Sequence, residues 1–382
     1  MTRQRNKIPD SNRKFKSGRK IRYAVVGLGY ISQVAVLPAF ANAHENSELV
    51  ALVSGDPRKL DTLGKKYRVK NKYSYDQYAD CLKSGEVDAV FIALPNNMHR
   101  RYTESAAEAG IHVLCEKPMA NTAAECESMI EAARRAKTKL MIAYRLHFEK
   151  ANLSAVEAIR KGKIGEPRIF RSTFCMQVAP GNNRVQRDPG SGPLHDVGVY
   201  CINAARYLFR AEPQEVFAFG ARSNDHRFAE VDEMIAALMR FPGDRLASFT
   251  CSFGAQGGSS VEVLGTKGVL KMCPAFEFTE ALKSELTVNG KTIRTTFGNS
   301  DHFAAQFLYF SNCILKNIEP EPNGAEGLQD MRIIDALLES REQGRPIALS
   351  FPHAGRRPTM QQEIHKPAVK NPQLVRAKSP AK

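Results

Sequence analysis

The chain has 382 residues, of which 43% are apolar, and a formal net charge of +15. This length allows about two or three domains with buried cores, and no apolar window approaches the roughly 18 residues of a membrane span. The charge lies mainly at the ends, because residues 1–20 hold +7 and residues 354–382 hold +6, which leaves +2 for residues 21–353.

Residues 1–20 and 354–382 are predicted to be flexible basic arms, because they are polar and rich in Lys, Arg, Asn, Gln and Pro. Phe15 is their only aromatic residue, so they lack the stacking groups of single-strand binders. A nucleic-acid partner is therefore disfavoured, although a weak, salt-sensitive attraction to polyanions stays open. The first arm has no apolar stretch typical of a secretory signal. The eight cysteines form no CxxC pair, which predicts reduced thiols, a cytoplasmic location and no metal site.

Short apolar runs alternate with helical patterns from residue 21 onward. Such alternation predicts parallel strands joined by right-handed crossovers, which is a doubly wound Rossmann sheet over residues 21–147. The expected strands are 22–26, 49–53, 89–94, 112–115 and 140–143, and the expected helices include 98–109 and 122–136.

The pattern changes after about residue 165, where strand-like runs follow one another with turn signals between them. We therefore expect residues 148–353 to form an α+β substrate-binding domain with a large, open, mainly antiparallel sheet. Its expected strands are 169–176, 215–220, 234–241, 247–253, 260–264 and 269–272, and its expected helices are 194–208, 302–316 and 326–343. If the nucleotide domain covers one face of this sheet, the other face is left for a homodimer or homotetramer contact.

Residues 27–32 read Gly-Leu-Gly-Tyr-Ile-Ser, a G-x-G-x-x-S form of the dinucleotide fingerprint. Gly27 would permit a tight turn, and Gly29 would let a pyrophosphate approach the backbone beside Tyr30 and Ile31 at the start of a helix. The motif follows the first expected strand and opens the first expected helix, which is the context that dinucleotide binding requires.

The end of the second expected strand indicates which dinucleotide is bound. An NAD enzyme usually has an acidic side chain there, but this chain has Ser54 and Gly55, with Asp56 one place later. The Ser54 hydroxyl together with Arg58 and Lys59 suits a 2′-phosphate, so NADP is favoured over NAD. Asp56 can equally cap the helix that follows, a role compatible with NADP.

Four further motifs resemble a known family. Residues 115–118 (Cys-Glu-Lys-Pro) are similar to the EKP signature of the glucose-fructose oxidoreductase and inositol dehydrogenase family, Gfo/Idh/MocA. Residues 93–99, 143–145 and 190–200 resemble its fourth-strand loop, the end of its sixth strand and its G-G-G-x-L-x-D-x-G-x-(H/Y) helix. The resemblance covers about residues 21–350 and implies an oxidoreductase that moves hydride between a nicotinamide and a sugar or polyol.

Two features resemble the glucose-fructose oxidoreductase branch of that family. One is Tyr200, where inositol-dehydrogenase-like members have His, and the other is Gly55 in place of the acidic NAD selector. Residues 181–187 differ from that branch, so the sugar is left open. The enzyme could keep its cofactor and exchange hydride between sugars, or release it as a simple aldose dehydrogenase. A non-catalytic NADP-binding sensor on the same fold is the alternative.

The resemblance assigns catalytic roles to three residues. Asp196 and Tyr200 are four residues apart and would share one helix face, although a capping Asp196 and a core-packed Tyr200 would also fit the sequence. Lys117 follows a parallel strand at the sheet edge where such folds bind ligands. We expect Tyr200 to exchange the proton, Lys117 to polarise the substrate oxygen and favour the phenolate, and Asp196 to orient a sugar hydroxyl.

The resemblance also implies cofactor contacts from the two loops that follow the fourth and fifth strands, and a cis peptide bond before Pro118. Tyr144 and Arg145 are expected beside the substrate or the nicotinamide, and His99 could instead be an ordinary helix cap. The implied cofactor contacts are Leu94, Pro95, Asn97, His99, Glu116, Lys117 and Arg145, and the implied substrate contacts are Lys117, Tyr144, Arg145, Asp196 and Tyr200.

Overall fold

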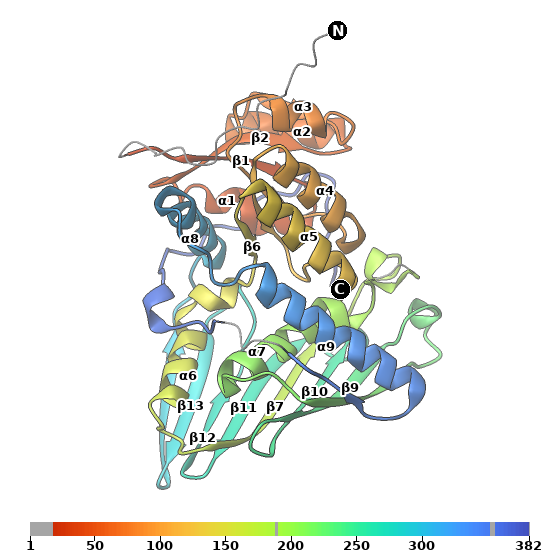
Figure 1. The fold of residues 1–382 in the computed structure, drawn as a ribbon, viewed down its shortest axis with the longest axis vertical. Helices are drawn as coiled ribbons and strands as arrows, with labels where there is room; N and C mark the ends of the chain where they lie inside the picture. Colours follow the sequence, from red (N-terminus) through yellow and green to blue (C-terminus); the bar gives the residue numbers. More distant parts are fainter. Residues whose placement is uncertain (1–17, 188–189, 352–355, 382) are drawn as a thin grey trace.

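The computed structural model describes residues 18–187, 190–351 and 356–381, and most of the first expected arm, residues 1–17, lies outside these ranges. A compact nucleotide domain sits above a broad sheet whose strands run side by side along the bottom of the molecule (Figure 1). Within the described ranges, no helix combines the length and apolarity needed to cross a membrane.

The predicted doubly wound sheet is confirmed. Six parallel strands lie in the order β3-β2-β1-β4-β5-β6. The strands are β1 (Ile21–Val26), β2 (Ser47–Val53), β3 (Asn71–Tyr73), β4 (Ala89–Ile92), β5 (His112–Cys115) and β6 (Leu140–Ile142). The helices between them are α1 (Leu37–Ala39) after a π-helical turn (Ser32–Val36), α2 (Pro57–Tyr67), α3 (Tyr78–Lys83), α4 (Asn96–Glu108) and α5 (Ala123–Ala136). The sequence pattern missed β3, because this three-residue edge strand has no fully buried residue.

The second sheet has nine strands in the order β14-β13-β12-β11-β7-β10-β9-β8-β15, and only its β7–β10 pair is parallel. Its strands are β7 (Pro167–Cys175), β8 (Glu215–Ala221), β9 (Met234–Phe241), β10 (Arg245–Ser252), β11 (Gly258–Gly265), β12 (Gly268–Met272), β13 (Leu282–Val288), β14 (Lys291–Phe297) and β15 (Ile347–Ala348). The expected mainly antiparallel sheet is confirmed. The hairpin of β13 and β14 was not predicted, because β14 is almost wholly exposed and so lacks alternating apolar residues.

One face of the nine-stranded sheet is covered by α6 (Lys150–Arg160), α7 (Val199–Phe209) and α9 (Gly324–Gln343) (Figure 1). We expected the nucleotide domain itself to cover that face, and this expectation is corrected. The domain's own amphipathic helices bury the sheet, and the nucleotide domain rests on the helical layer and on the upper edge of the sheet (Figure 1).

Helix α8 (His302–Lys316) follows the second sheet but packs against the first one. The Phe307 ring lies 5.1 Å from the Tyr23 ring and 4.4 Å from the Phe40 ring, measured between centroids. The Tyr23 hydroxyl is 2.8 Å from the Ser311 hydroxyl. The two domains therefore share a buried aromatic core, which holds them in one orientation.

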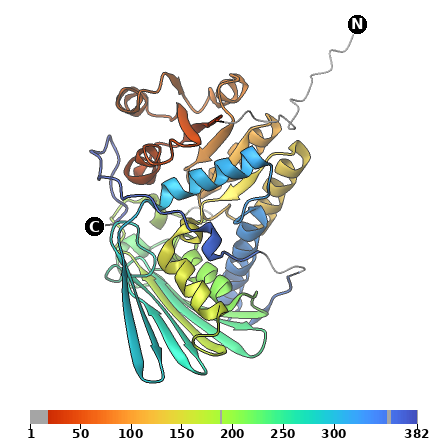
Figure 2. The ribbon, with the colours of Figure 1, turned by 90° about the vertical axis from the view of Figure 1, so that its left-hand side faces the viewer.

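The described part of the C-terminal tail, residues 356–381, lies along the body and is not the solvated arm that its composition predicted (Figure 2). Arg357 is only 8% exposed and donates to Glu212 over 2.6 Å and to Glu326 over 3.3 Å. These carboxylates also bind the fully buried Arg206. Buried acids need paired cations, so part of the tail's charge neutralises the domain core.

Candidate active site

The glycine turn follows β1 as predicted. Gly27 has a φ of +94°, and a Cβ on it would lie 2.4 Å from the Ala93 carbonyl oxygen, so only glycine fits. The Ser32 hydroxyl donates to the Gly27 carbonyl over 2.6 Å and holds the turn against the helix. A Cβ on Gly29 would meet no atom within 4 Å, so the backbone there is open to an approaching phosphate.

The carboxyl end of β2 places Asp56 at the start of α2. Its Oδ1 accepts from the Arg58 amide over 3.0 Å and from the Lys59 amide over 3.4 Å, so the capping role is confirmed. Ser54 is 4% exposed, and its hydroxyl accepts from the Asp56 amide over 3.2 Å. The carboxylate at the end of β2 is therefore engaged as a helix cap, which suits a site for a 2′-phosphate.

Lys117 follows β5, and its peptide bond to Pro118 is cis as expected. The ammonium donates to the Asp196 carbonyl over 2.8 Å and to Asp196 Oδ1 over 3.1 Å, and it lies 4.8 Å from the Tyr200 ring centroid. Burial lowers the pKa of Lys117, but the charges of Tyr200, Asp196 and Glu116 together raise it by more. The net pKa of Lys117 is therefore above its usual value. Lys117 is therefore a permanent cation at the site.

Asp196 lies in a π-helical turn, Leu194–Gly198, that leads into α7. Its Oδ2 accepts from Arg184 Nε over 2.6 Å. Burial raises the pKa of Asp196, but Arg184 and Lys117 outweigh it and hold the pKa below its usual range. Asp196 is thus a fixed carboxylate that accepts hydrogen bonds. Arg184 was not predicted, and the one hint to it was that residues 181–187 differ from the glucose-fructose oxidoreductase branch.

Tyr200 is flanked by a second cation, Arg145. Arg145 Nη2 donates to the Tyr200 hydroxyl over 3.4 Å, and its guanidinium carbon lies 5.3 Å from the ring centroid. Arg145 is 5% exposed and is fixed by the Phe276 carbonyl and by His302 Nδ1, at 3.0 Å. Burial, followed by the charge of Arg145, lowers the pKa of His302 well below its usual value, so His302 is a neutral acceptor for the guanidinium.

These groups meet in one cleft of about 530 Å³ between the two domains. Glu116 also faces it: burial raises the pKa of its carboxyl to about 7, and its buried Oε1 has no protein partner among the described residues. An orphaned oxygen beside an open glycine turn fits a bound dinucleotide. The predicted residues that line the cleft are Gly29, Tyr30, Ile31, Leu94, Pro95, Asn97, Glu116, Lys117, Arg145, Asp196 and Tyr200.

Other predicted residues lie outside the lining. His99 is fully buried, and its ring bonds the Pro118 carbonyl over 3.0 Å and the Leu94 carbonyl over 2.9 Å, so it joins the two loops from beneath. The Tyr144 hydroxyl donates to Asp330 over 2.6 Å behind the cleft wall. Gly27, Ser54 and Gly55 follow directly after β1 and β2, and Lys59 lies in the first turn of α2; all four are outside the residues that line the cleft. Over the described residues, no three His, Cys, Asp or Glu side chains gather as metal ligands.

A glycine turn and a lysine at the carboxyl edge of a parallel sheet, together with a carboxylate and a tyrosine from a second domain, define a two-domain dinucleotide-binding oxidoreductase. Residues 21–144 match the model of an oxidoreductase family with an NAD-binding Rossmann fold, and residues 153–271 match the GFO/IDH/MocA C-terminal domain. The chain belongs to the Gfo/Idh/MocA oxidoreductase family.

Named relatives span nearly the same length. The chain is 33% identical to D-xylose 1-dehydrogenase [NADP(+)] of Haloarcula marismortui, over 86% of this chain and 93% of that protein. It is 28% identical to D-xylose 1-dehydrogenase (NADP(+)) 2 of Haloferax volcanii, over 86% and 99%. Among solved structures, the aldose-aldose oxidoreductase of Caulobacter crescentus complexed with glycerol is 37% identical, with a TM-score of 0.83 over 87% of this chain and all of that one.

Proposed function

We propose that this chain is an NADP-dependent aldose oxidoreductase that oxidises the anomeric hydroxyl of a sugar to a lactone and catalyses the reverse reduction. The observation that carries the proposal is the contact of the Lys117 ammonium with both Asp196 and the Tyr200 ring on the wall of a cleft that begins at the glycine turn. The names of the two D-xylose dehydrogenases and of the aldose-aldose oxidoreductase support the same substrate class.

In the proposed reaction, the substrate's hydroxyl proton passes to the Tyr200 Oη as the carbon loses its hydride. Bound NADP would supply the hydride acceptor at its nicotinamide ring. Lys117 and Arg145 lie on the Tyr200 ring at 4.8 and 5.3 Å, so they stabilise the negative charge that develops on the two oxygens that share the proton. Asp196, held by Lys117 and Arg184, accepts from a second sugar hydroxyl and fixes the reacting carbon.

The choice of NADP rests on the end of β2. Asp56 is engaged as the cap of α2, and Ser54 and Lys59 stand on either side of it. A cap carboxylate cannot easily rotate to bind a ribose 2′-hydroxyl, whereas a hydroxyl and a cation are typical partners of a 2′-phosphate.

The direct experiment is an absorbance assay on purified protein that is first tested for bound NADP. We expect reduced-nicotinamide absorbance to appear on addition of an aldose, and to vanish when an aldonolactone or a ketose follows. If protein that binds NADP shows no absorbance change with any aldose, ketose, polyol or inositol, the proposed enzymatic activity is refuted. The hypothesis of a non-catalytic NADP-binding sensor would then remain.

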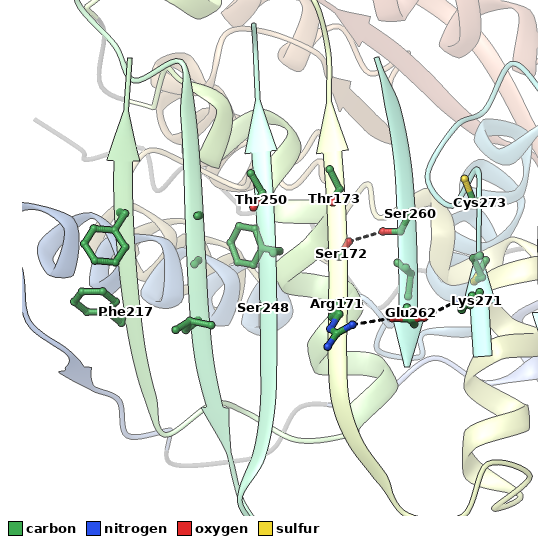
Figure 3. Close-up of a pocket in the computed structure, with 17 residues that line it drawn as sticks. Arg171, Ser172, Thr173, Phe217, Ser248, Thr250, Ser260, Glu262, Lys271 and Cys273 are labelled. Carbon is green, nitrogen blue, oxygen red and sulfur yellow. Dashed lines mark hydrogen bonds and ion pairs between the residues drawn. The ribbon is translucent and has the colours of Figure 1, made fainter. Parts of the chain in front are cut away.

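We also propose that the free face of the nine-stranded sheet joins a second copy of this chain in a homodimer. Strands β7 to β12 line a shallow hollow of about 630 Å³ on this face (Figure 3). Phe219 and Leu238 are 67% and 55% exposed there. On the other side of the hollow, beyond β10 and β7, Glu262 pairs with Lys271 over 2.9 Å and with Arg171 over 3.5 Å. An apolar area rimmed by paired charges is typical of a contact between copies.

Light scattering of the substituted protein tests this interface. Leu238→Asp should convert the homodimer to a monomer, because each copy would bring an unpaired carboxylate into the buried contact. Ile318→Asp is the matched control. Ile318 is 49% exposed, follows α8 and is not among the residues that line the hollow. A wild-type monomer, or a dimer that survives Leu238→Asp, would refute the interface.

A further inference from the structure

The last described residues of the tail, Val375 to Ala381, form a segment that we call the strap. At its start, the Val375 amide donates to Gln33 Oε1 over 2.7 Å, and the Val375 carbonyl accepts from Gln33 Nε2 over 2.9 Å. At its end, the Pro380 carbonyl accepts from the Ala179 amide over 2.8 Å, and Ala381 forms an antiparallel bridge with Val178. Gln33 belongs to the nucleotide domain and Ala179 to the second domain, so the strap is fixed on both sides of the cleft. In Figure 2 the chain end, marked C, lies where the two domains meet.

Gln33 joins the strap directly to the glycine turn. Its side chain is buried, with 1% of the residue exposed, and Nε2 donates over 3.0 Å to the carbonyl of Leu28, the residue between Gly27 and Gly29. One buried amide therefore holds both the strap and the turn. Since a buried amide that lost one of these partners would be left unsatisfied, the docked strap and the formed turn stabilise each other.

Two cations of the strap lie where a dinucleotide carries phosphate. Arg376 Nε is 3.2 Å from Asp56 Oδ2, at the end of β2. Arg376 has a φ of +47°, a left-handed conformation that is uncommon outside glycine and is retained here where the guanidinium meets Asp56. Lys378 is exposed and lines the cleft together with Gly29 and Tyr30. The strap thus pairs with the acid at the end of β2 and brings an ammonium into the cleft that contains Gly29.

We propose that the strap is part of the dinucleotide site, that it keeps NADP bound through successive turnovers, and that Arg376 selects the 2′-phosphate of NADP against NAD. The proposal rests on the proposed function in that this cleft is taken to bind NADP. A cofactor beneath the strap leaves only when the bonds to Gln33 and Ala179 break. The hydride taken from one sugar then returns to a second sugar on the same nicotinamide, so no free NADP has to bind between the two half-reactions.

The test compares the full-length chain with a variant that ends at Leu374 and with Arg376→Gln. NADPH release is followed by the loss of its enhanced fluorescence after a chase with excess NADP, and affinities for NADPH and NADH come from titration. We expect truncation to speed release by about tenfold or more and Arg376→Gln to weaken NADPH binding about tenfold with NADH binding unchanged, the loss typical of a charged hydrogen bond. Lys370→Gln is the matched control, because it removes the same charge from an exposed position of the tail before the strap.

The outcomes separate the strap from the proposed function. Release at the wild-type rate from the truncated chain refutes retention, and an unchanged ratio of NADPH to NADH affinity in Arg376→Gln refutes selection. Either result, with aldose turnover intact, leaves the proposed function standing. Wild-type protein that binds no NADPH would overturn the proposed function and the strap together. If the truncated chain fails to fold, the release rate and the affinity ratio of Arg376→Gln decide both points.

Discussion

Replacing Lys117 with Met tests the centre of the proposed mechanism. The substitution removes the ammonium but keeps an unbranched side chain of similar length against the Tyr200 ring. Asp196 loses one donor, the ammonium that lies 2.8 Å from its carbonyl oxygen and 3.1 Å from its Oδ1, and keeps Arg184 at 2.6 Å. The carboxylate is therefore still paired, and we expect the fold to survive.

The magnitude follows from the position of the ammonium. A preorganised donor to a developing oxyanion contributes about 10²–10³ in kcat, or about 3–4 kcal/mol of transition-state stabilisation. Lys117 is a permanent cation, so its loss should reach the upper part of that range. NADPH affinity should change little, because the glycine turn, the end of β2 and the strap are untouched. Lys163→Met, at an exposed position, is the control for the loss of one charge.

The assay measures kcat and KM for an aldose together with the NADPH dissociation constant of the same preparation. A Lys117→Met protein that binds NADPH and turns over at the full wild-type rate would refute the assignment of Lys117. Loss of NADPH binding in parallel with turnover would instead make Lys117 a cofactor-holding residue, the other role that the family resemblance implies.

Three further substitutions probe the same cleft. Tyr200→Phe keeps the ring contacts but removes the proton carrier, so kcat should fall by about 10²–10⁴ with unchanged melting temperature; full activity would exclude Tyr200 as the acid-base group. Arg184→Gln frees one oxygen of Asp196 and should raise the sugar KM about tenfold, the effect of one charged hydrogen bond, and an unchanged KM would show that Arg184 does not help to position the sugar. Burial raises the pKa of Glu116 to about 7 from 4.5, so the folded state binds the extra proton between these values and is destabilised as pH rises from about 5 to 7. Glu116→Gln should abolish that fall, at most about 3 kcal/mol of unfolding free energy, and denaturant titrations that keep the full pH slope would refute it.

The fold could be predicted where the apolar residues of a buried element recur at the spacing of a helix or a strand. The inner strands of the nucleotide sheet are apolar because helices cover them on both faces, so even short inner strands can be recognised in the sequence. Strand β14 lies at the edge of its sheet and is almost wholly exposed, so its sequence contains no apolar run that would indicate a strand. The family motifs located Lys117, Asp196 and Tyr200, and the structure places these three in contact.

Arg184 and the strap could not be found in the same way, because they reach the cleft through irregular backbone. Arg184 comes from a short loop whose direction is set by its contact with Asp196, and no periodicity marks it. The strap is held by Gln33, by the Ala179 amide and by Asp56, and Gln33 is a buried amide that looks in the sequence like any polar helix residue. A side chain that acts through one long-range hydrogen bond cannot be recognised from the residues next to it in the sequence.

The basic composition of the tail has a different meaning once its partners are known. Flexible arms would spread +6 into solvent, which favours polyanions in general. Instead Arg357 binds Glu212 in the core, Lys366 pairs with Glu45 at the surface, and Arg376 pairs with Asp56 beside the cleft. Three cations along the tail thus pair with acids of the body. Because this sequence of pairs guides the chain from the second domain to the nucleotide domain and back across the cleft, the charge serves the docking of the tail, and the ligand it favours is the phosphate of a dinucleotide.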